Sequence, residues 1–319
     1  MYYGRWPWYW DLWARSVANN PNIDFLIFTD LDIPNIYSEN ISFANLSLEE
    51  AELRFSNVLN FKVLIRSPHK LCDYKSLFGL AFCDYLMNYK YWGYCDVDLI
   101  FGDLSPFVEL TDTGYYDIIS PWDFTVGHCT IIKNVERCNS ISLKTNCLES
   151  RLREPDTTFI DEGGFSETAL KIGGFKFKVC EDVLTEFEKD QCFLGATIGP
   201  ACMISRINTD FIVRFKQNKI YISFGKETQE HEVLYLHFMA AKNKKYWVNY
   251  KGGGFDGWVF SRIGWIEKPA LDPRFIKGYL IKSFFFNLPD LIYAKIRGLV
   301  PSKAVMFLKK MKLKITKKR

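Results

Sequence analysis

The sequence predicts an α/β fold with a mixed, mainly parallel sheet that is flanked by helices. Short apolar runs alternate with amphipathic segments through the first hundred residues, an order that is typical of parallel strands joined by helices. The chain of 319 residues is 48% hydrophobic and 17% aromatic, which is ample material for a large core. This composition excludes a disordered chain and a collagen-like fibre.

The expected elements can be placed in order along the chain. A helix is expected over 8–17, and the apolar run Ile23–Thr29 predicts a buried parallel strand. The run Ser-Leu-Glu-Glu from Ser47 predicts a capping box and the start of a helix. Further helices are expected over 73–88 and over 162–172, where Gly173-Gly174 ends the pattern. Further strands are expected over 61–65, 91–100, 116–120, 129–133, 176–179, 220–224 and 233–238.

Charge is distributed very unevenly. Residues 274–319 hold 13 basic residues and one acidic residue, so this end carries +12 while residues 1–273 carry −8. We therefore divide the chain into a body, 1–265, and a basic aromatic tail, 266–319. The tail predicts an amphipathic helical segment that binds an anionic membrane surface; a solvated basic face and a protein-docking helix are the alternatives. An acidic body argues against a nucleic-acid partner.

Cysteines and apolar runs indicate the compartment. The nine cysteines include no Cys-x-x-Cys pair, so we expect reduced thiols and no zinc ribbon. The first residues contain no signal peptide, and no run reaches the roughly 18 apolar residues of a spanning helix. The expected location is cytoplasmic, peripheral on the inner face of the membrane.

Asp96-Val97-Asp98 is the sharpest motif in the sequence. The two carboxylates interrupt an apolar strand, in which positions i and i+2 share one face. Burying two like charges is costly unless a cation compensates, and Mn²⁺ or Mg²⁺ prefers such oxygen ligands. The alternative is a strand end whose carboxylates face solvent. Asp103 is more simply a turn residue than a third ligand.

Two blocks of residues carry a resemblance to a known family. The segments 70–79 and 92–104, which include Asp96-Val97-Asp98, resemble the D-x-D region of nucleotide-sugar glycosyltransferases with the GT-A fold, which is Rossmann-like. More narrowly, roughly residues 2–240 resemble a bacterial family of capsule and lipopolysaccharide glycosyltransferases. The chain begins with residues that resemble those after the first GT-A strand. Either that strand is missing from this chain or the start is misassigned.

The resemblance implies a set of site residues. Asp96, Asp98 and His237 would hold the metal ion, although a lone histidine on an apolar strand is more often a core residue. A carboxylate at Asp161 or Glu162 would be the catalytic base in an inverting enzyme and would orient the sugar in a retaining one; helix N-terminal acids are the alternative.

Other positions would contact the donor or the acceptor. The donor nucleotide would contact Thr29 and Asp30, for which strand-end capping is the alternative. Its diphosphate would lie near Asp96 and near Asp73 and Lys75, which open a predicted helix; a solvated lysine is the alternative there. Donor-sugar or acceptor contacts are expected from Trp122, Asp123 and His128.

These residues together predict a metal-dependent glycosyltransferase. The donor would be a nucleotide-sugar, expected to be UDP-linked, with Mn²⁺ or Mg²⁺ as cofactor. The acceptor would be a glycan or a lipid-linked sugar. A non-catalytic carbohydrate-binding protein on the same fold, or a metal-dependent nucleotidyltransferase or phosphodiesterase, would also use these residues. The sequence leaves open the sugar, the acceptor, the anomeric outcome and the oligomeric state.

Overall fold

A computed structural model gives the architecture of most of the body. It describes residues 1–35, 38–180, 182–188, 191–194, 211–224, 230–238, 259–261 and 264–266. The predicted amphipathic tail therefore lies outside the described residues. Within the described part of the chain, no helix is long and apolar enough to cross a membrane.

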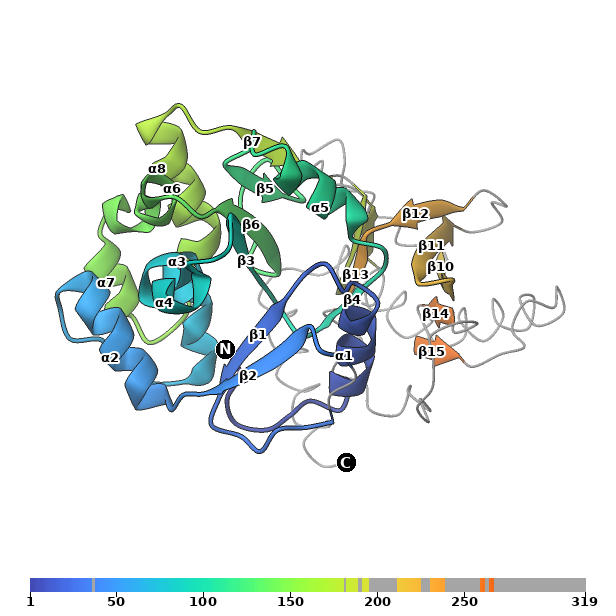
Figure 1. Cartoon of the computed structure of the whole chain (residues 1–319), viewed down its shortest axis with the longest axis horizontal. Coiled ribbons are helices and arrows are strands. Elements are labelled where there is room, and N and C mark those ends of the chain that lie inside the picture. The colour runs from blue at the N-terminus through green and yellow to red at the C-terminus, as the bar shows by residue number, and fades with distance from the viewer. Residues whose placement is uncertain are drawn as a thin grey trace, which may run out of the picture.

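The described strands form four small sheets, two of which meet at the candidate site (Figure 1). The first sheet pairs β1 (Phe25–Thr29) with β2 (Ile41–Asn45). The central sheet has the order β3 (Tyr91–Cys95), β6 (Cys129–Lys133), β5 (Ile118–Ser120) and β7 (Phe177–Val179). The third has the order β4 (Leu99–Phe101), β13 (Tyr235–Phe238), β8 (Val183–Glu188) and β9 (Gln191–Leu194). The fourth has the order β12 (His231–Val233), β11 (Lys219–Phe224), β10 (Phe211–Lys216), β14 (Val259–Ser261) and β15 (Gly264–Ile266).

Helices cover the flanks of these sheets (Figure 1). Those of the first hundred residues are α1 (Trp10–Ala18), α2 (Leu48–Leu59), the 3₁₀ helix η1 (Pro68–Leu77), α3 (Phe78–Ala81) and α4 (Cys83–Leu86). Those that follow are α5 (Ser105–Asp112), α6 (Glu136–Asn139), η2 (Ile141–Lys144), α7 (Leu148–Arg153), the π-helical turn η3 (Ile160–Gly164) and α8 (Phe165–Ile172).

The mixed α/β class is confirmed, but the expectation of a mainly parallel sheet is wrong for the described strands. Only β1–β2, β5–β7 and β8–β13 pair in parallel, and the other described pairings are antiparallel. One reason is local: β10 and β11 are joined by Gln217-Asn218, both with positive φ, and such two-residue turns make antiparallel hairpins.

Several predicted elements are confirmed close to their expected bounds. The Ser47 hydroxyl accepts a hydrogen bond from the Glu50 N–H, and the Glu50 carboxylate accepts one from the Ser47 N–H, which completes the capping box of α2. The strand β6 matches its prediction residue for residue. Helix α8 ends at Gly173, whose φ of 75° only glycine adopts readily.

The segment 61–65 is not a strand, contrary to the prediction. Val63 and Ile65 are buried as an apolar run suggests, but their N–H groups do not join a sheet. The Val63 N–H donates to the Ser56 hydroxyl at 2.9 Å, and the Ile65 N–H donates to the Glu52 carboxylate at 2.5 Å. Side chains of α2 therefore satisfy this backbone, so no strand partner is needed.

The single helix predicted over 73–88 is also wrong. The chain instead forms η1, α3 and α4, with a break at Phe82, whose φ is −125°. The helical spacing of apolar residues was nevertheless informative, because Leu77 and Ala81 are both buried. Gly79 packs against the Trp92 ring so closely that a Cβ would lie 2.6 Å from it.

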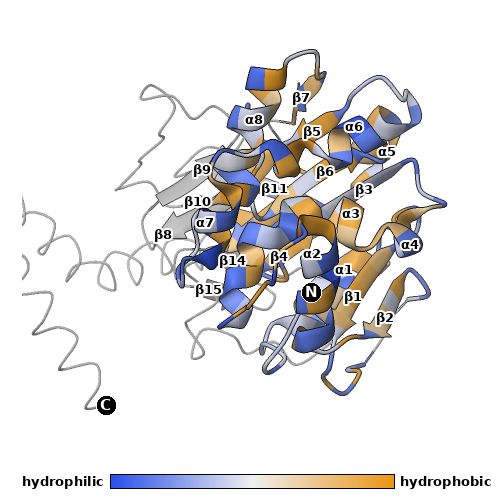
Figure 2. Ribbon diagram, turned by 90° about the vertical axis from the view of Figure 1, so that its left-hand side faces the viewer, coloured by the Kyte–Doolittle hydropathy of each residue, from blue (hydrophilic) through white to orange (hydrophobic). Residues whose placement is uncertain are grey.

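Apolar side chains concentrate between the sheets and the helices. In Figure 2 the strands of the interior are largely coloured as hydrophobic, while the outer helices are mixed. One core cluster joins α1 to β1, β4 and the start of β13 through Trp13, Ile27, Phe101 and Tyr235. This packing fixes the two strands, β4 and β13, that border the candidate site.

Candidate metal centre

The two aspartates of the D-x-D motif lie in a link between two sheets. The predicted strand 91–100 is split, because β3 ends at Cys95 and β4 begins at Leu99. The Asp96 N–H donates to the His128 carbonyl at 3.0 Å, and the Phe238 N–H donates to the Asp98 carbonyl at 3.1 Å. The expectation that both carboxylates share a face of one strand is therefore wrong; backbone hydrogen bonds to the turn before β6 and to β13 hold this link instead.

Strand pairing brings His237 to these carboxylates. The strand β13 pairs antiparallel with β4, and His237 lies opposite Leu99, the residue after Asp98. The His237 Nε2 lies 3.6 Å from Asp98 Oδ2, which is too long for a good hydrogen bond. Ligand atoms of Asp96, Asp98 and His237 all lie within 4.8 Å of one another. The three residues predicted as metal ligands are thus brought together.

The donor set suits a divalent cation. Two carboxylates and one imidazole fit Mn²⁺ well and Mg²⁺ less well, because imidazole is a softer donor than oxygen. Asp98 and His237 are buried, at 3% and 5% exposure. A buried carboxylate and a buried imidazole are costly unless a partner compensates their polar atoms. The His237 Nδ1 is also buried and has no hydrogen-bond partner among the described residues, so this ring has a buried nitrogen that is not satisfied.

His128 lies against the metal-ligand set. Its ring stacks on that of His237, with centroids 4.4 Å apart and planes 26° apart, and it contacts the Trp122 ring edge-on at 5.8 Å. Burial, and then the neighbouring His237, lower the pKa of His128 well below its usual value, so the ring is neutral. Asp123, predicted beside these residues, is exposed and is not brought into the cluster.

Lys75 is held in the same site by two hydrogen bonds. Its Nζ donates to Asp96 Oδ1 at 2.5 Å and to the Gly127 carbonyl at 2.7 Å. Burial alone would lower the pKa of Lys75, but the carboxylates of Asp96 and Asp161 outweigh it and raise the pKa. Lys75 therefore keeps its positive charge beside the candidate ligands.

Asp161 and Glu162 lie in η3, and the carboxylates of both lie close to Gly127. Burial raises the pKa of Asp161 to about 7, although Lys75 opposes the shift. Glu162 Oε1 accepts a hydrogen bond from the Gly127 N–H at 3.0 Å. A Cβ at Gly127 would lie 2.8 Å from Asp161 Oδ2, so only glycine allows this approach. Gly127 thus joins Lys75 to the carboxylates, a role that the sequence did not predict.

Comparison with known proteins places these residues in one family. A family of unknown function, DUF6625, matches residues 1–255. The chain belongs to this family. No curated protein and no solved structure matches the chain. The matched span contains the whole candidate centre and the carboxylates of η3, so the site lies within the part of the chain that defines DUF6625.

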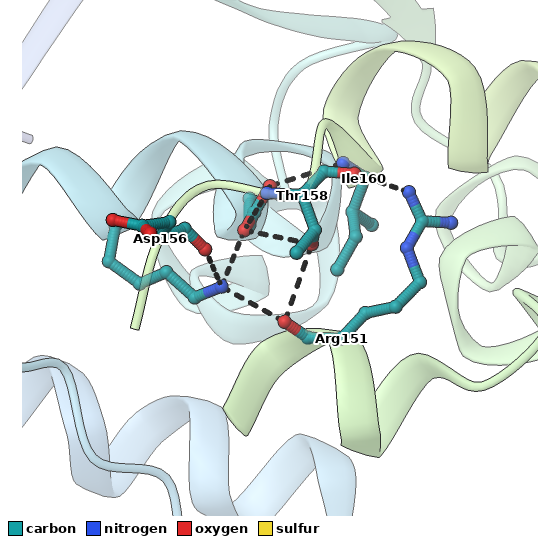
Figure 3. Close-up of polar contacts among 6 residues, drawn as sticks. Arg151, Asp156, Thr158 and Ile160 are labelled. Atoms are coloured by element: carbon teal, nitrogen blue, oxygen red, sulfur yellow. Dashed lines mark hydrogen bonds and ion pairs between the residues drawn. The ribbon is translucent and has the colours of Figure 1, made fainter. Parts of the chain in front are cut away.

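One residue predicted to bind the diphosphate in this DUF6625 protein has a different environment. Asp73 is fully buried and forms an ion pair with Lys70, with Nζ to Oδ2 at 2.7 Å (Figure 3). Its carboxylate accepts hydrogen bonds from the Thr158 N–H and hydroxyl and from the Ile160 N–H. The Lys70 Nζ also donates to the carbonyls of Arg151 and Asp156, at 2.9 and 2.8 Å (Figure 3). Asp73 therefore anchors the segment before Asp161 and is not directed at a donor.

Thr29 and Asp30 end β1 but do not enter the ligand cluster of the DUF6625 site. The Thr29 hydroxyl accepts a hydrogen bond from the Leu31 N–H at 3.2 Å, as in a strand-end turn. Asp30 is exposed. The sequence did not predict a role for Tyr9, yet its ring packs edge-on against Phe238 at 5.2 Å.

The pKa of Tyr9 also responds to the charge of Asp98. Burial, and then the charge of Asp98, raise its pKa. Tyr2, whose ring stacks on Trp6 at 5.1 Å, shows the same two effects. The aromatic run at the start of the chain was the available signal for this pair, but composition alone did not connect it to Asp98.

Proposed function

We propose that this DUF6625 protein is a metal-dependent glycosyltransferase with a GT-A-type, Rossmann-like fold. It transfers a sugar from a UDP-sugar to a glycan or lipid-linked acceptor during assembly of a bacterial capsule or lipopolysaccharide. The observation that carries the proposal is the convergence of Asp96, Asp98 and His237 within 4.8 Å. A D-x-D pair is weak by itself, but a histidine from a distant strand at the same point is much more specific.

Charge explains how the residues around the centre would act. A bound divalent ion would supply Lewis-acid stabilisation of a diphosphate leaving group. Lys75 keeps Asp96 in place through its 2.5 Å ion pair and adds a fixed positive charge to the same site. The neutral His128 packs behind His237 and restricts the position of that ring.

Asp161 is the candidate base of an inverting reaction. A carboxyl with a pKa of about 7 is substantially ionised at neutral pH and is a stronger base than an ordinary aspartate. Such a group would accept the proton of an acceptor hydroxyl. In a retaining reaction no base is needed, and Asp161 with Glu162 would orient the sugar. The hydrogen bond from the Gly127 N–H to Glu162 supports a fixed position for the pair.

The cellular setting is a proposal that rests on the tail. We place the enzyme in the cytoplasm, on the inner face of the membrane, because residues 274–319 carry +12. Each basic residue near an anionic leaflet contributes about 1 kcal/mol of attraction. A lipid-linked acceptor would be found at that surface.

Calorimetric titration with UDP in the presence and absence of Mn²⁺ tests the donor site. We expect UDP to bind wild type only with Mn²⁺, and Asp98→Asn to weaken that binding at least about tenfold, since removing one ligand typically costs this much or more. Asp103→Asn is the matched control, because Asp103 is a turn carboxylate that accepts hydrogen bonds from the Ser105 N–H and hydroxyl. If wild type shows no Mn²⁺-dependent affinity for UDP, the proposal is contradicted and a non-catalytic carbohydrate-binding protein is favoured.

Product analysis separates the remaining alternative. Incubation with a panel of UDP-sugars and Mn²⁺ should release UDP, while nucleoside triphosphates should not release pyrophosphate. Pyrophosphate release would instead indicate a nucleotidyltransferase, which uses the same carboxylate chemistry.

A further inference from the structure

Phe159 has a backbone conformation that its side chain does not favour. Its φ and ψ are 55° and 45°, in the left-handed region, where bulky residues are genuine outliers. The residue is also 59% exposed, so burial of apolar surface offsets the strain only in part. Asn or Gly would fit the same backbone at lower cost. Folding alone therefore does not explain a phenylalanine at this position.

The surrounding structure holds Phe159 in this conformation. The Asp73 carboxylate accepts hydrogen bonds from the N–H groups of Thr158 and Ile160, one on each side of Phe159 (Figure 3). Lys70, itself 2% exposed, neutralises Asp73 and donates to two backbone carbonyls nearby. The fully buried Lys70–Asp73 ion pair therefore fixes the backbone of one short loop. A strained backbone that its surroundings hold in place is typical of functional sites.

The loop leads directly into the candidate carboxylates. Asp161 follows two residues later, so the two Cα atoms are no more than about 7 Å apart. Ile160 and Asp161 are buried, at 0% and 3% exposure, while Phe159 is exposed. The chain therefore passes from the surface into the site within three residues. Phe159 therefore lies at the surface, beside the point where the chain enters the candidate site.

We propose that Phe159 forms an acceptor-sugar subsite, in which its ring packs against the C–H face of a pyranose. The face of an aromatic ring carries partial negative charge and attracts such C–H groups. The ligand class is thus a hexopyranoside, with its hydroxyl toward Asp161 and its apolar face on Phe159. The choice of a sugar as the ligand and its role as acceptor both rest on the proposed function, whereas the strained, exposed position of Phe159 does not.

Saturation-transfer NMR with methyl glucoside, methyl galactoside and methyl N-acetylglucosaminide tests the subsite directly. Phe159→Asn keeps a residue that tolerates the left-handed backbone but removes the ring, and Phe159→Tyr keeps the ring. We expect at least one glycoside to bind wild type and Phe159→Tyr, and Phe159→Asn to bind it about tenfold more weakly. Tyr115→Asn is the matched control, because Tyr115 is another exposed aromatic residue, at 56%.

The outcomes separate this inference from the proposed function. Binding of none of the three glycosides to wild type, or equal binding by Phe159→Asn, would overturn the subsite. The Mn²⁺-dependent binding of UDP should be the same in wild type and Phe159→Asn; its loss in the variant would show that Phe159 acts through the fold, which also overturns the inference. Glycoside binding that depends on Phe159 in a protein that never binds UDP would refute the transferase and leave the sugar site standing.

Discussion

Asp161 offers the sharpest test of the electrostatics of the site. Burial raises its pKa from 3.8 to about 7, so the folded protein prefers the protonated form. The stability that protonation contributes is fully present below the unfolded pKa and is lost as the pH rises through about 7. The shift of roughly 3 units corresponds to about 4 kcal/mol in total. Between about pH 5 and about pH 8, roughly 3 kcal/mol of this is lost.

Asp161→Asn removes the ionisable group while keeping the shape of the side chain. We expect the variant to be more stable than wild type, and the difference in unfolding free energy to grow by about 3 kcal/mol from about pH 5 to about pH 8. Urea unfolding of both proteins in the presence of a chelator measures this, because groups that do not interact with Asp161 titrate alike in both proteins and cancel in the difference. An equal difference at the two pH values would show that Asp161 titrates normally and would remove the argument for a base with a raised pKa.

Two further predictions concern the buried ion pair and the tail. Lys70→Met leaves Asp73 buried and uncompensated, since the two side chains are only 2% and 0% exposed, and should lower the unfolding free energy by about 3–5 kcal/mol in urea. Deletion of residues 274–319 should abolish cosedimentation with vesicles that contain anionic lipid, because this segment carries a net charge of +12 while residues 1–273 carry −8.

Each of these has a control. Arg153→Met breaks an exposed pair with Glu149, at 55% and 53% exposure, and should change stability by less than about 1 kcal/mol; a loss at Lys70 no larger than this would contradict the anchoring role. Vesicles of neutral lipid should not bind the full chain. Unchanged sedimentation of the shortened chain with anionic vesicles would remove the membrane proposal.

Local patterns predicted the elements that depend on local interactions. The capping box at Ser47 formed as expected because both partners lie within one turn. The runs at 25–29 and 129–133 formed strands because their residues are apolar and β-branched or aromatic. The segment 61–65 has a similar composition, yet Ser56 and Glu52 of α2 bind its N–H groups first. A competing partner of this kind is not visible in the segment itself.

The candidate site was predicted in part, through residue types that carry their chemistry with them. Asp96, Asp98 and His237 could be named because carboxylates in an apolar run are costly without compensation and because the surrounding blocks resemble a known family. Asp73 could be named but not placed, because its i,i+3 partner Lys70 turns it away from the site. Gly127 could not be found, since its role is the absence of a side chain beside Asp161.

The sequence by itself determined the α/β class, the helix caps, the main apolar strands and the chemistry available to the site. Only the tertiary structure decided that strand 91–100 is two strands, that β13 carries His237 to Asp98, and that a buried ion pair shapes the loop at Phe159. The physical reason is how far apart in the sequence the interacting residues lie. Caps and strand propensities depend on neighbours in the chain, whereas burial, pKa and ligand distances depend on which distant segments pack together.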